Sequence, residues 1–84
     1  MQQTFLVRDG VECLVGWDSP MQTFFGQVYK VDSRGERTDD EPLLWVGTHQ
    51  GEIHAVEELA RLLRAEKASI PSEIYGKLYA IEVD

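Results

Sequence analysis

TFLVRDGVECLVGW, residues 4–17, is the stretch that decides the fold, because it sets two apolar runs on either side of Asp9-Gly10. An Asp-Gly pair between such runs is the strongest short-range signal of a β-hairpin closed by a type I′ turn, whose two central residues both have positive φ. A two-residue loop would also fix the register of the two strands. The predicted opposite pairs are Arg8 with Val11, Leu6 with Cys13, and Thr4 with Val15.

This register sorts the apolar side chains of the hairpin onto the two faces of the sheet, because successive residues of a strand point to opposite sides. The richer face would carry Leu6, Val11, Cys13 and Val15. The leaner face would carry Phe5, Val7 and Leu14. Since both faces hold apolar residues, we expect the turn to do more than the hydrophobic pattern to set the register.

Two further strands follow the hairpin along the chain. Asp18-Ser19-Pro20 ends the second strand, since proline lacks a donor for strand pairing and Asp and Ser favour turns. Gly26, in the middle of the aromatic third run, predicts either a bulge or a close approach by another side chain. Asp32–Pro42 is polar and charged, and we expect a flexible loop there. The four predicted strands are Thr4–Arg8, Val11–Trp17, Phe24–Val31 and Leu43–Gly47.

The last third of the chain is predicted to be helical. Apolar residues recur there at helical spacing, with acidic residues early and basic residues late, which predicts a helix over about His54–Lys67. Pro71 favours a second helix start and a shorter helix over Ser72–Tyr79, with a fifth strand over Leu78–Val83 as the alternative. The side chains expected to face the sheet are Ile53, Val56, Leu59, Ala60, Leu63, Ile74 and Leu78.

Together these elements predict a single α+β domain over residues 1–84. Four antiparallel strands in meander order would be followed by one long and one short helix packed on one face of the sheet (ββββαα). The strands are apolar on both sides, whereas an antiparallel sheet in a small domain usually has one wet face. We therefore expect some large aromatic residues to lie on the uncovered face as an interface, the alternative being that they belong to the core. The candidates are Trp17, Phe25, Tyr29 and Trp45.

The charge of the chain limits its partners. The net charge is −7, which opposes binding to nucleic-acid phosphates. No Lys or Arg lies between Arg37 and Arg61, so the acidic residues of that stretch could form a patch for a basic partner. No signal peptide or membrane span is indicated. The only cysteine, Cys13, cannot form an internal disulfide, which predicts a reducing cytoplasm.

Three groups of residues have side chains that could carry chemistry. His49 and His54 with Glu52 could bind zinc, but the histidines lack the i, i+4 spacing of a helical pair. Cys13 could act as a nucleophile, but a cysteine in the middle of a strand is usually a small buried hydrophobe. Asp39-Asp40-Glu41 lacks the pattern of a calcium loop. We therefore predict no catalytic, cofactor-binding or metal site.

The sequence indicates three hypotheses about the class of function. The first hypothesis is a non-catalytic cytoplasmic protein-interaction or adaptor module that self-associates or is covered by a partner protein. The alternative is an acidic mimic or inhibitor that occupies a basic site on another protein. A small enzyme built around His49, His54 or Cys13 is the third hypothesis. Neither a nucleic acid nor a membrane is expected as a partner.

Overall fold

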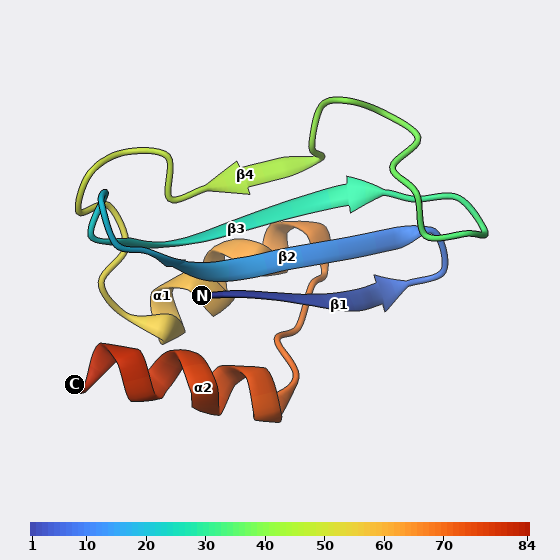
Figure 1. The fold of residues 1–84 in the computed structure, drawn as a ribbon. Coiled ribbons are helices and arrows are strands. Elements are labelled where there is room, and N and C mark those ends of the chain that lie inside the picture. The colour runs from blue at the N-terminus through green and yellow to red at the C-terminus, as the bar shows by residue number, and fades with distance from the viewer.

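A four-stranded antiparallel sheet lies against two helices in the computed structural model of the chain, which describes residues 1–84 (Figure 1). The strands lie in the order β1-β2-β3-β4, so each pairs with its neighbour in sequence and the predicted ββββαα arrangement is confirmed. None of the helices has the length and apolar character needed to cross a membrane. The elements are β1 Gln2–Arg8, β2 Val11–Asp18, β3 Thr23–Lys30, β4 Leu44–Val46, α1 Val56–Leu63 and α2 Ser72–Glu82.

The first helix was predicted to be the longer one, but α1 has 8 residues and α2 has 11. α1 starts at Val56 because Ala55 is still extended, and after Leu63 it continues only as a 3₁₀ turn over Arg64–Glu66. Lys67 then adopts a left-handed φ of 58°, which ends the segment. α2 begins directly after Pro71 and runs to Glu82, so the alternative of a fifth strand is wrong.

The first hairpin has a different register from the predicted one. Arg8 pairs with Val11 as expected, but the register shifts between Leu6 and Arg8, so that Phe5 lies opposite Cys13. Only Gly10 has a positive φ in this turn, at 78°, so the turn is not type I′. A positive φ at the second central residue alone also excludes type II′, the other turn whose twist matches that of the strands, and an extra residue in β1 accommodates the difference.

This one-residue shift exchanges two neighbouring side chains between the faces of the sheet. Phe5, predicted on the leaner face, is only 9% exposed and belongs to the core. Leu6, predicted to accompany Cys13, is 64% exposed. The prediction for Leu6 was therefore wrong, because a slip of one residue reverses the direction of every side chain beyond it.

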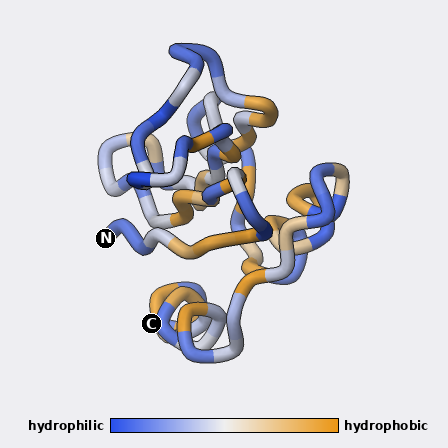
Figure 2. The backbone as a smooth tube through the Cα atoms, turned by 90° about the vertical axis from the view of Figure 1, so that its right-hand side faces the viewer, coloured by the Kyte–Doolittle hydropathy of each residue, from blue (hydrophilic) through white to orange (hydrophobic).

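The core lies between the sheet and the helices. In Figure 2 the apolar stretch of β1 passes above α2, consistent with the layering in Figure 1. The sheet contributes Phe5, Val11, Cys13, Val15, Phe24 and Val28 to the buried cluster. The rest of the chain contributes Ile53, Val56, Leu59, Leu63, Ala68 and Leu78. Two of the predicted helix contacts are only partly buried: Ile74, which packs against this cluster, and Ala60, which is not part of it.

Gly26 allows α1 to approach the middle of the sheet. The pairing of β2 with β3 continues past Gly26 without a shift, so there is no bulge. A Cβ at this position would lie 2.9 Å from Cδ2 of Leu63 and 3.2 Å from Cδ1 of Leu59. The predicted close approach is thus made by the two leucines of α1.

The end of α2 caps the start of α1. Ala55 provides no side-chain cap, and instead the Val56 N–H donates to Oε1 of Glu82 at 2.7 Å. A carboxylate in the last turn of a helix opposes that helix's own dipole but is favourable at the N-terminus of another. Glu82 therefore acts as a tertiary contact that holds the two helices together.

Candidate interaction face

The four aromatic residues proposed from the sequence are divided between the two faces of the sheet. Trp17 pairs across the strands with Phe24, and their rings meet edge to face with centroids 4.9 Å apart on the side of the core. Trp45 and Phe25 line a hollow on the other side of the sheet. We call this side, opposite the helices, the open face. Trp17 thus supports the core more than the open face.

Tyr29 is on the open face but is closed off by its neighbours. Its side chain is only 8% exposed, and the guanidinium carbon of Arg37 lies 3.7 Å from the ring centroid. The Tyr29 hydroxyl donates to Oε1 of Gln27 at 2.9 Å. A cation over the ring and a hydrogen-bonded hydroxyl leave little of this side chain available to a partner.

Trp45 is the most exposed aromatic residue of the sheet. Its side chain is 54% exposed, and it lies directly opposite Gln27 in the pairing of β3 with β4. Phe25 is half-buried because its ring covers Gly16 on the neighbouring strand, where a Cβ would lie 2.9 Å from the ring atoms. Trp45 and Phe25 are therefore the two candidate residues that remain available on the open face.

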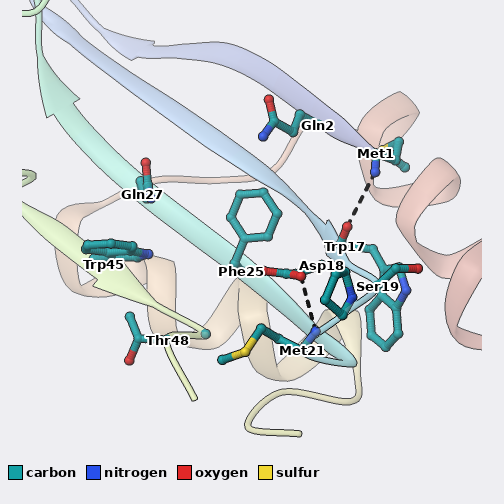
Figure 3. A pocket seen from close by; sticks show the side chains of 12 residues that line it. Met1, Gln2, Trp17, Asp18, Ser19, Met21, Phe25, Gln27, Trp45 and Thr48 are labelled. Carbon is teal, nitrogen blue, oxygen red and sulfur yellow. Dashed lines mark hydrogen bonds between the residues drawn. The ribbon is translucent and has the colours of Figure 1, made fainter. Parts of the chain in front are cut away.

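A hollow of about 690 Å³, lined by both of these residues, lies at one end of the sheet (Figure 3). At one rim Asp18 accepts a hydrogen bond from the Met21 N–H at 3.2 Å, and the amino group of Met1 donates to the Trp17 carbonyl oxygen at 3.4 Å. Both apolar and polar residues line the hollow. Its lining is Met1, Gln2, Trp17, Asp18, Ser19, Pro20, Met21, Phe25, Gln27, Trp45, Gly47 and Thr48.

Gln27 adds a polar side chain to the hollow, directly across the strands from Trp45 and two positions along β3 from Phe25 (Figure 3). Because its Oε1 accepts the hydrogen bond from Tyr29, the orientation of the amide is fixed. The two N–H bonds of Nε2 then point away from Tyr29 and are free to donate. The indole N–H of Trp45 is a second donor on the same surface.

One wall of the hollow is held in place by Glu52. Its carboxylate accepts hydrogen bonds from the Gly47 N–H at 2.9 Å, from Nδ1 of His49 at 3.0 Å and from the His49 N–H at 3.3 Å. These bonds, the one from Gly47 foremost, lower the pKa of Glu52. Gly47 has a φ of 80°, and a Cβ there would clash with the Phe24 carbonyl oxygen, so only glycine fits this turn.

The histidines, Cys13 and the acidic loop do not come together in one site. His49 is engaged by Glu52, while no three His, Cys, Asp or Glu side chains come together in a way that could hold a metal ion. Cys13 is fully buried, and burial raises its pKa to about 12, which disfavours the nucleophilic thiolate. In the acidic loop, the Asp39 carboxylate accepts the Glu41 N–H at 3.4 Å, and all three acidic residues are exposed.

Sequence reasoning missed Gln27, although a signal for it was present. Gln27 alternates with Phe25 and Tyr29 along the third strand, and residues two apart in a strand share a face. The residues that reach the hollow from the turns, such as Met21 and Thr48, carry no such periodicity. Met21 lies in the turn between β2 and β3 and Thr48 in the segment between β4 and α1, so only the fold brings them to the same hollow.

The sequence and the structure were compared with known proteins. No protein family matches the sequence, and neither a curated protein nor a solved structure matches the chain.

Proposed function

We propose that the chain is a non-catalytic protein-interaction module that binds its partner through the open face. The observation that carries this proposal is the 54% exposed Trp45 beside Phe25 in a hollow on the face that the helices leave uncovered. Tryptophan is rich in apolar surface and is enriched among the residues that dominate binding energy at interfaces. Leaving it in water forgoes burial that a partner can supply.

The net charge limits the kind of partner, and the cysteine indicates the compartment. A net charge of −7 makes a nucleic acid an unfavourable partner even though the open face carries aromatic residues. A protein surface tolerates that charge, especially where it is itself basic. We place the protein in the cytoplasm, because its only cysteine is a free, fully buried thiol and no disulfide contributes to stability.

Trp45→Ala tests the proposal, with Tyr79→Ala as the matched control. Tyr79 is an aromatic residue of similar exposure, 50%, on α2 and outside the hollow. Light scattering reports self-association, and capture from the native host reports partner proteins. We expect wild type and Tyr79→Ala to form a dimer or retain the same partner, and Trp45→Ala to lose it.

Two results would speak against this function. If wild type is a monomer that captures the same proteins as Trp45→Ala, the open face is not an interaction surface. A complex that survives Trp45→Ala but dissociates steeply with rising salt would instead favour an acidic mimic, because screening weakens charge pairs and hardly affects apolar contacts.

A further inference from the structure

We propose that the outer side of α2 binds a second copy of the chain, with the two α2 helices antiparallel. This contact is separate from the open face and goes beyond the function proposed for that face. It follows from the apolar residues that α2 leaves uncovered, from a groove at Gly76 and from the arrangement of charges beside this groove.

α2 carries apolar residues on two sides, although only one side packs on the protein. Leu78 is fully buried, and Ile74 and Ile81 pack beside it against the core. On the other side of the helix Tyr79 is 50% exposed and Val83 is 62% exposed. α2 is also the outermost element below the sheet in Figure 1. Because a helix that is apolar all round is usually buried all round, the outer side of α2 lacks a cover.

A groove of about 420 Å³ lies on this outer side. Its lining is Ile70, Ser72, Tyr75, Gly76 and Tyr79. A Cβ at Gly76 would meet no atom within 4 Å, so no contact within the chain requires a glycine there. Glycine weakens the middle of a helix. A side chain of another helix that enters the groove would give this glycine a structural role.

The outer side of α2 has the residue spacing of a helix–helix contact. Four of its residues follow one another at intervals of four, three and four: Ser72, Gly76, Tyr79 and Val83. Packed helices have this spacing along their contact, because each side chain inserts between residues of the facing helix. In an antiparallel pair centred near Gly76, Tyr79 of each copy would enter the groove of the other. The groove therefore suits a second α2.

The charges beside the groove favour a second copy and determine its direction. Glu73 and Lys77 lie on one flank of the contact, with Oε1 and Nζ 4.0 Å apart. In an antiparallel pair this flank meets the same flank of the other copy in reverse order, so that Glu73 faces Lys77 at two places. A parallel pair would place Glu73 against the flank that carries Tyr75 and Glu82, which offers no cation.

The contact is expected to be weak. The net charge of −7 repels another copy, although repulsion between distant charges is screened at physiological ionic strength. Because a small contact area gives a low affinity, we expect a dissociation constant of about 0.1–1 mM. At low micromolar concentration, which suits the test of the open face, the α2 contact is dissociated. It gains importance where binding through the open face concentrates the chain.

Sedimentation equilibrium of Trp45→Ala tests the α2 contact in a chain whose open face is disabled. At about 0.1–1 mM we expect an equilibrium between monomer and dimer. Adding Gly76→Ala should weaken the dimer at least about tenfold, because its methyl group fills the groove that receives Tyr79. The same methyl group meets no atom within the chain, so the folded monomer should be kept.

Charge reversal decides whether the occupant is a second copy. Glu73→Lys alone and Lys77→Glu alone should each weaken the dimer about tenfold, because like charges then face each other. An equal mixture of the two variants should restore it, since every facing pair again has opposite signs. The matched controls are Glu57→Lys and Arg61→Glu, exposed residues of α1 with the same spacing, and mixing these two should give no such recovery.

Three results would overturn the inference. The first is a Trp45→Ala variant that stays monomeric up to about 1 mM. The second is a Gly76→Ala dimer as strong as that of its parent, and the third is a mixture of charge-reversed variants that associates no better than either alone. Circular dichroism of each variant checks that the helices are intact. None of these results affects the open-face proposal, which depends on Trp45 at low micromolar concentration.

Discussion

Gly26→Ala should destabilise the protein because the added methyl group enters the contact between β3 and α1. The new Cβ would lie 2.9 Å from Cδ2 of Leu63 and 3.2 Å from Cδ1 of Leu59. Both leucines are fully buried, so neither can turn away into solvent. Relief of the contact therefore requires a rotamer change within the packed core or a small outward movement of α1.

The size of the effect is the difference between two opposing contributions. Overpacking a well-packed core costs about 1–3 kcal/mol. Replacing a strand glycine by alanine recovers roughly 0.5–1 kcal/mol, because the unfolded chain loses conformational freedom. Gly26 has no positive φ, so no backbone strain is added. Taking the middle of each range, we expect a net loss of about 1 kcal/mol, a large share of the stability of a small domain.

Urea unfolding followed by circular dichroism measures this loss, and Gly76→Ala is the matched control. Gly76 lies in the middle of α2, and a Cβ there would meet no atom within 4 Å. The same chemical change should therefore stabilise the protein by roughly 0.5–1 kcal/mol, the difference in helix propensity. The midpoints of the two variants should move in opposite directions from wild type with little change in slope.

A double-mutant cycle with Leu63→Val decides whether the contact is the cause. Valine lacks the δ carbons, so Gly26→Ala should lose most of its cost in that background. The reasoning is refuted if Gly26→Ala is as stable as wild type, or if its cost is the same with and without the δ carbons of Leu63.

Three further predictions follow from the bulge, the tertiary cap and the loop at the hollow. Phe5→Ala should cost about 3–5 kcal/mol and Leu6→Ala less than about 0.5 kcal/mol in denaturant unfolding; the unbulged register would reverse this order. Glu82→Ala should cost about 1 kcal/mol by leaving the Val56 N–H without its partner, with partial recovery in Glu82→Gln. If Glu82 acted only on the dipole of its own helix, its removal would stabilise the protein instead. Because the folded pKa of Glu52 lies below the usual value of 4.5, its contribution is complete above that pH and is lost as the pH falls through the lowered pKa. The unfolding free energy of wild type and Glu52→Gln should therefore differ at neutral pH and converge in acid; a difference independent of pH would contradict this origin.

Much of the architecture could be predicted because it depends on local chemistry and on periodicity. Pro20 and Gly47 mark the ends of strands β2 and β4, and helical spacing of apolar residues marks α1. The candidate site was predictable only in part. Alternation along the third strand places Phe25 and Tyr29 on one face, yet only the fold shows that Arg37 returns across the loop to cover Tyr29.

The order of the elements, the helical C-terminal third and the acidic character of the chain all follow from the amino-acid sequence without the fold. Each of these depends on residues close together in the chain or on simple composition. Tertiary structure alone decided that Phe5 and not Leu6 enters the core, because a single bulged residue reverses the faces of β1. It also decided that Trp17 faces the core while Trp45 remains open, because the helices can cover only one side of the sheet.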